Sequence, residues 1–155
     1  MRSILATRVA KLMQQMLTSS GWLRSELRRL DQAGASDPHM RKLCDLLDSL
    51  DTSIAWDLRD ELRGLSSRSS PQSVTILGWL RADIDPLTQL VCRLDRECRG
   101  HPLVTAAMIA CGDIVGRFMD LERELAPTDR AARAGSGLAP TWRLPSPAAE
   151  LPLLC

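Results

Sequence analysis

Apolar residues recur along most of the chain at alternating steps of three and four, which is the spacing of one face of an α-helix. The stripe that begins at Leu77 is the most regular, because it continues to Cys98 without a missing step. Aromatic residues, which strands favour, are scarce: the chain has no tyrosine and one phenylalanine. The pattern therefore predicts helices alone, over residues 3–30, 38–64, 71–98 and 102–126.

Signals for helix ends and interruptions accompany these stripes. Asp37 and Ser70 each precede a proline at a first helical position, so both are expected to cap helices. Gly64 is expected to close the second helix. Pro86 lies inside the third helix, where it should bend the helix or divide it in two. Gly21 is a second point at which a helix can break.

The fourth helix is apolar on two faces, and no charge occurs from Leu103 to Gly112. A helix of this kind packs against neighbours on both sides, so we expect it to be the central helix of the bundle. Met108 and Ile114 should then lie in the core. Gly112 and Gly116 should allow another helix to approach closely.

These features predict an all-α fold, an antiparallel bundle of four or five helices over residues 1–126. Short connections at residues 33–36 and 99–102 favour antiparallel neighbours. After Ala126 the helical period ends and prolines become frequent. We expect residues 127–155 to form a disordered tail, with Trp142 as an isolated point for docking a partner.

Charge and targeting signals narrow the function. The formal net charge is +1, which disfavours nucleic-acid binding driven by the release of counterions. No apolar run is judged long enough to span a bilayer, so no integral membrane contact and a cytoplasmic location are expected. Residues 1–25 carry basic residues and no acid, like a mitochondrial presequence, so a mitochondrial location is the alternative.

Catalytic constellations are not evident in the sequence. The chain has neither a glycine-rich phosphate loop nor an HExxH pattern, and it has two histidines, His39 and His101. His39 and Lys42 have the spacing seen in histidine phosphotransfer domains, which are helical bundles. A small helical enzyme or phosphotransfer protein is therefore an alternative, although a capping or surface histidine is the stronger interpretation.

The cysteines are also candidate metal ligands. Five cysteines form no CxxC pair and are expected to be reduced, mostly buried thiols. Cys98 and His101 are three positions apart, and Cys92 or Cys44 could join them. Zinc sites normally show tighter paired spacings, so we expect no metal and no cofactor.

One short stretch matches a recognition motif. Residues 108–113, MIACGD, with Val104 before and Val115 after, resemble the BH3 motif of apoptosis regulators. The resemblance implies apolar anchors on one helix face and an aspartate that pairs with an arginine of a partner's groove. A buried core helix is the competing and favoured interpretation. The partner-binding residues that this resemblance implies are Met108, Cys111, Gly112, Asp113 and Val115.

A second likeness covers two stretches. KLMQQMLT, residues 11–18, and ACGDIVGRFMDLER, residues 110–123, are similar to the first and third helices of GAT domains. GAT domains are three-helix bundles in trafficking adaptors. The resemblance implies binding of ubiquitin or a small GTPase.

A basic face is expected on the first helix. Arg24, Arg28 and Arg29 fall on adjacent turns and could grip an acidic partner or a phosphate. The alternative is pairing with the second helix, whose residues 45, 48 and 51 are aspartates, and we favour this pairing.

We therefore expect a non-enzymatic protein-interaction module, an adaptor or regulatory subunit whose partner binds a groove of the bundle or the tail. The long regular stripes exceed what one core can bury, so a helical partner or self-association into a homo-oligomer is expected. The GAT-like adaptor, the BH3-like or Bcl-2-type apoptosis regulator and the small helical enzyme remain alternatives.

Overall fold

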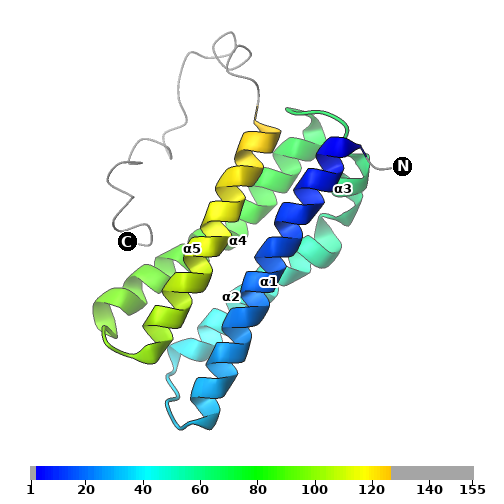
Figure 1. Cartoon of the computed structure of the whole chain (residues 1–155). Helices are drawn as coiled ribbons and strands as arrows, with labels where there is room; N and C mark the ends of the chain where they lie inside the picture. The colour runs from blue at the N-terminus through cyan, green and yellow to red at the C-terminus, as the bar shows by residue number, and fades with distance from the viewer. Residues whose placement is uncertain (1–2, 127–155) are drawn as a thin grey trace.

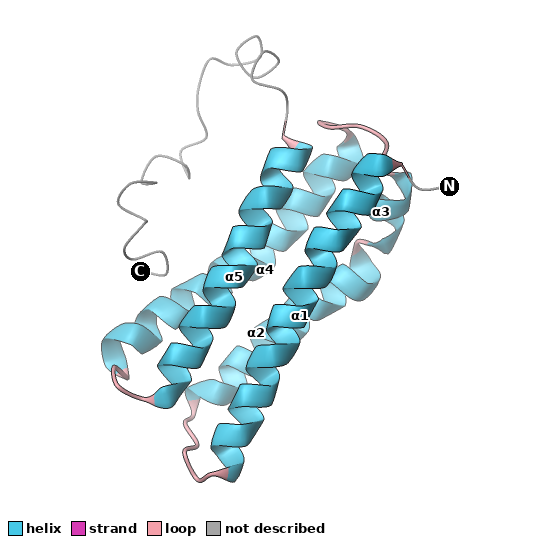
Figure 2. Cartoon of the chain, in the orientation of Figure 1, coloured by secondary structure: helices cyan, strands magenta, loops and turns pink. Residues whose placement is uncertain are grey.

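The computed structural model describes residues 3–126, and every regular element within them is a helix (Figure 2). The prediction of an all-α fold is confirmed. The predicted tail, residues 127–155 with Trp142, lies outside the described residues. In chain order the elements are α1 (Ile4–Gln32), α2 (His39–Thr52), the π-helical segment η1 (Ser53–Asp57), α3 (Arg59–Gly64), α4 (Pro71–Glu97) and α5 (Pro102–Leu125).

The long helices run alternately in opposite directions, so neighbours in sequence are antiparallel, as predicted (Figure 1). In the view of Figure 1, α1 and α5 lie in front, and α2 and α4 lie behind them. α5 packs along both α1 and α4, and α2 packs against both α4 and α1, which closes the four helices into a ring. α3 continues the line of α2 beyond η1.

A single hydrophobic core fills the centre of this ring. Each long helix contributes the apolar stripe that its sequence predicts, so the period of three and four alone selects most of the core. The largest fully buried side chains are those of Met13, Met16, Leu23, Leu43, Leu47, Leu50, Leu58, Leu65, Ile76, Leu80, Leu87 and Leu94.

The predicted cap at Ser70 is present, whereas the N-cap residue of α2 is Pro38 and not the predicted Asp37. Ser70 Oγ accepts a hydrogen bond from the backbone N–H of Ser73 at 3.2 Å, and α4 begins at Pro71. Asp37 Oδ1 accepts from the backbone N–H of His39 at 2.8 Å. α2 begins at His39, one residue after the predicted first position, and Asp37 lies one residue before the N-cap residue.

Neither predicted interruption divides a helix. α1 continues through Gly21, because Ser20 and Leu23 on either side of it are buried against the rest of the bundle. α4 continues through Pro86, which lies on the solvent side of the helix. Because proline has no N–H, the carbonyl four residues earlier accepts no hydrogen bond within the helix. On the solvent side of the helix this carbonyl remains accessible to water.

The helix predicted over residues 38–64 is instead interrupted at η1. The backbone N–H of Leu58 donates to the carbonyl of Ser53 at 2.8 Å, which is the five-residue step of a π-helix. Ile54 and Leu58 are both buried, so the wider turn returns the chain to the core before α3 begins. α3 ends at Gly64, as predicted.

Two expectations for α5 are wrong. Ile114 is fully buried as expected, but Met108 is 36% exposed. A Cβ added at Gly112 or Gly116 would meet no atom within 4 Å, so no helix presses against either glycine. In a ring of four helices each helix has two neighbours and one outer face, and α5 turns these residues outward.

α5 also bears on the expectation that no run could span a bilayer. By length and hydropathy alone α5 could cross a membrane, although 44% of its most apolar window is buried inside the bundle. A helix that belongs to a protein core passes the same test, so this observation is only a weak indication of a membrane span.

Candidate functional site

Polar contacts fix the register of α1 against α5. Ser19 donates a hydrogen bond to the carboxylate of Asp113, and Arg8 forms an ion pair with Glu124 at 3.6 Å. Eleven residues separate the two contacts on each helix, as antiparallel packing requires. Trp22 lies one turn after Ser19 and Ile109 one turn before Asp113, so Trp22 and Ile109 lie at the same level of this seam.

The surface beside this seam is apolar. Ile109 is 58% exposed and Trp22 is 42% exposed, and Met108 and Met119 are also exposed. On α5 the two glycines lie between Met108 and Met119, and Asp113, Arg117, Asp120 and Arg123 line the same shallow hollow as the glycines and Met119. We call this surface the α1–α5 outer face, made of Trp22, Met108, Ile109, Gly112, Gly116 and Met119.

The residues of the BH3-like stretch are divided between core and surface. Cys111 is fully buried, and burial raises the pKa of its thiol to about 11. Val115 is half-buried, whereas Met108 is exposed. Asp113 is held by Ser19 and by an ion pair with Arg117 at 3.6 Å. A groove could therefore receive all the apolar anchors together only if α5 left the bundle.

The two stretches that are similar to GAT helices are neighbours in space. Residues 11–18 lie in α1 and residues 110–123 in α5, and the register above brings them side by side. GAT domains are three-helix bundles, whereas the described residues add a fourth long helical stretch to the ring.

The predicted pairing of the basic face with the second helix is confirmed for Arg24. Its Nη1 lies 2.5 Å from Asp48 Oδ1, and its Nη2 lies 2.7 Å from Asp51 Oδ2. Burial raises the pKa of Asp51 above its usual range. Arg29 pairs within its own helix instead, with Glu26 at 2.7 Å.

A shallow pocket of about 370 Å³ adjoins these arginines where α1 meets the start of α2. Its wall includes Arg24, Arg28 and Arg41, but also Asp31 and Asp37. Since Arg24 is already paired and two carboxylates face the same space, the pocket is not a simple anion site.

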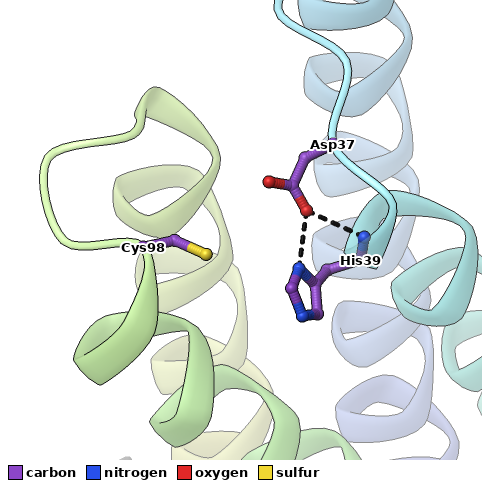
Figure 3. A group of neighbouring side chains, drawn as sticks. All are labelled: Asp37, His39 and Cys98. Atoms are coloured by element: carbon purple, nitrogen blue, oxygen red, sulfur yellow. Dashed lines mark hydrogen bonds and ion pairs between the residues drawn. The ribbon is translucent and has the colours of Figure 1, made fainter.

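A third cluster lies at the end of the bundle where the α1–α2 connection meets the end of α4 (Figure 3). Asp37 Oδ1 lies 2.6 Å from Nδ1 of His39, and the Sγ of Cys98 points toward this pair. A carboxylate oxygen, a ring nitrogen and Sγ, one from each residue, lie within 4.8 Å of one another. Such a set of donors can hold a metal ion.

The electrostatics of this cluster are mixed. The hydrogen bond from the backbone N–H of His39 lowers the pKa of Asp37. Partial burial, together with Asp37 and Glu97, raises the pKa of the Cys98 thiol. His101 does not join the cluster, because its Nδ1 accepts a hydrogen bond from the backbone N–H of Leu103 at 3.0 Å and caps α5.

Sequence reasoning found only part of this cluster. It paired Cys98 with His101 and with Cys92 or Cys44, but the structure brings Cys98 to Asp37 and His39. A signal was available in the spacing: Asp37 and His39 begin one helix and Cys98 ends another, and antiparallel neighbours bring such ends together.

Three candidate functional sites are therefore found among the described residues. They are the α1–α5 outer face, the pocket beside the arginines of α1, and the cluster of Asp37, His39 and Cys98. Comparison of the chain with models of protein families, with curated proteins and with solved structures finds no match in any of the three.

Proposed function

We propose that the chain is a non-enzymatic interaction module that binds a helix of a protein partner on the α1–α5 outer face. The observation that carries this proposal is the exposure of Ile109 and Trp22 at one level of the seam, with Met108 also exposed next to Ile109 on α5. Apolar surface that is contiguous and exposed is typical of interaction sites.

The shape of the strip suits a helix. From Met108 to Met119 the strip is about 16 Å long, which matches three turns of an apposed helix. Gly112 and Gly116 lack side chains, and open space lies above both of them. A partner helix can therefore lie close to the α5 backbone between the two methionines, with its own apolar residues spaced at three and four.

The upper part of the same seam supplies a polar border. Arg8, Lys11, Asp120, Arg123 and Glu124 surround a shallow depression there. An apolar centre with a mixed charged rim is the usual anatomy of a protein interface. The rim favours one orientation of the partner helix, since its charges have to complement those of the seam.

The proposal is tested with the full chain carrying Ile109→Asp. Ile109 is exposed, so the substitution should leave the helical circular dichroism unchanged. The tagged wild type and the tagged variant are each used to capture proteins from cell extract. The variant should capture about tenfold less, or still less, of each protein that the wild type binds, because the substitution buries a charge in the apolar contact.

The matched control is Val74→Asp, which places the same charge at a position of α4 that is 67% exposed. This variant should capture the same proteins as the wild type. Equal capture by Ile109→Asp and the wild type would remove the α1–α5 outer face as the binding surface. If the face binds a second copy of the chain, light scattering of the purified protein shows a dimer that Ile109→Asp dissociates.

A further inference from the structure

We propose that Asp37, His39 and Cys98 form a binding site for a borderline-soft divalent metal ion, with Zn²⁺ as the best match. The proposal does not depend on the α1–α5 outer face. The three residues lie at one end of the bundle and come from two segments that are far apart in the chain (Figure 3).

The distances between the donor atoms fit a metal ion after small movements. Tetrahedral zinc with bonds to oxygen, nitrogen and sulfur places its donor atoms roughly 3.3–3.8 Å apart. The donor atoms of Asp37, His39 and Cys98 lie within 4.8 Å of one another. All three side chains are half-buried, so rotations about their χ angles can widen the 2.6 Å contact between Asp37 and His39 and adjust the position of Cys98 without displacing a helix.

The chemistry of the donors selects the ion. A thiolate is a poor ligand for Mg²⁺ and Ca²⁺, which prefer oxygen donors alone. Sulfur, imidazole nitrogen and carboxylate oxygen together suit Zn²⁺. Three protein ligands leave a fourth position of the tetrahedron for water.

The local structure holds each donor in place. Asp37 is fixed by the hydrogen bond from the backbone N–H of His39 at 2.8 Å, which also orders the first turn of α2. Cys98 directly follows the last residue of α4, and its backbone N–H donates to the carbonyl of Leu94 at 2.8 Å. The chain then turns sharply at Gly100, whose φ of +96° is a value that glycine adopts without steric cost.

Protons balance on binding. The ion replaces the proton of the hydrogen bond between Asp37 Oδ1 and His39 Nδ1, and these two atoms, which are 2.6 Å apart without the ion, separate to about 3.3 Å. The neutral imidazole then carries its proton on Nε2, and the thiol proton of Cys98 is released to solvent. His101 cannot serve as a ligand while its Nδ1 caps α5, since Nε2 of the neutral ring then bears the proton.

Metal binding by the full chain tests the proposal. All proteins carry Cys155→Ser, so the last cysteine cannot contribute a ligand. Metal-free protein is titrated with Co²⁺ as an optical substitute for Zn²⁺ and then with Zn²⁺ in competition. We expect one equivalent of Co²⁺ to produce a sulfur-to-cobalt charge-transfer band, and Zn²⁺ to abolish it.

Three further variants identify the ligands. Cys98→Ser should remove the band, and His39→Ala and Asp37→Asn should each weaken Zn²⁺ binding by about tenfold or more. Cys44→Ser is the matched control, because it removes another half-buried thiol near the start of α2 and should leave the titration unchanged. Circular dichroism verifies that each variant is folded.

A charge-transfer band of equal intensity in folded Cys98→Ser protein would overturn the proposal, and so would the absence of a band in the parent protein. Unchanged Zn²⁺ affinity in both His39→Ala and Asp37→Asn would do the same, because it would show that a thiol alone retains the ion.

Discussion

Arg81 of α4 donates a hydrogen bond through Nη2 to Oε2 of Glu122 of α5, at a distance of 3.0 Å. Glu122 is only 3% exposed, whereas the arginine is partly open to solvent. The guanidinium of Arg81 also lies 5.8 Å from the centroid of the Phe118 ring. The contact thus brings compensating charge to a carboxylate inside the core, and it connects two antiparallel helices at the same time.

Arg81→Ala should lower the free energy of unfolding by about 2–4 kcal/mol, because it leaves a buried carboxylate without its arginine. Arg63→Ala is the control, since Arg63 pairs with the exposed Asp60 in α3 and should lose less than about 0.5 kcal/mol. Urea unfolding of both variants measures the difference. Similar losses would mean that Glu122 does not depend on Arg81.

The two faces of α5 should respond differently to truncation. Ile114→Ala removes a fully buried side chain and should cost about 2–5 kcal/mol of stability. Met108→Ala removes an exposed side chain and should cost less than about 1 kcal/mol. Chemical denaturation of both variants measures the two losses in free energy of unfolding. Equal losses for Met108→Ala and Ile114→Ala would contradict the orientation of α5 described above.

Gly116→Ala should stabilise the chain by about 0.5–1 kcal/mol, because alanine loses less conformational freedom than glycine in a helix. No atom lies within 4 Å of the added Cβ, so no clash offsets this gain. The same substitution at Gly34 should destabilise, since its φ of +81° disfavours any side chain. A melting temperature of Gly116→Ala below that of the wild type would contradict this prediction, because it would show that another part of the protein contacts this face.

Asp83 should make stability depend on pH. Burial raises the pKa of this carboxyl above its ordinary value, while a hydrogen bond from Ser53 opposes the rise. Folding therefore favours the protonated form, and the cost of holding the charged form is present at neutral pH and disappears as the pH falls through the raised pKa.

Asp83→Asn should accordingly raise the melting temperature at pH 7, and the gain should be smaller at about pH 4, because the pH has then fallen through the raised pKa of Asp83. Asp85→Asn replaces an exposed carboxylate of the same helix and should change the melting temperature little at either pH. A gain for Asp83→Asn that is the same at both pH values would exclude charge as its cause.

The sequence specified most of the bundle because its stripes of three and four are long. Leu80 and Ile84 illustrate the strength of the signal, since α4 remains one helix around Pro86, a residue that tends to break helices. The cap at Ser70 was readable because a serine before a proline has a defined chemical role.

The orientation of α5 could not be read in the same way. The first half of α5 has no charged residue from Leu103 to Gly112, so no charged stripe marks its outer face there, and Met108 and Ile114 are both apolar. Their different exposure depends on which neighbours flank α5 in the ring. The cluster of Asp37, His39 and Cys98 likewise depends on a meeting of helix ends that are about sixty positions apart in the chain.

The π-helical segment η1 has a consequence for insertions and deletions. Its wide turn holds one residue more than an α-helical turn, and Ala55 within it is exposed. Removing Ala55 would change the step from Ile54 to Leu58 from four positions to three, and both steps return to the same helix face. The chain should therefore tolerate the loss of Ala55 with little change in melting temperature. Loss of the exposed Gln89 in α4 should unfold the bundle, because every later core residue of that helix would rotate by about 100°.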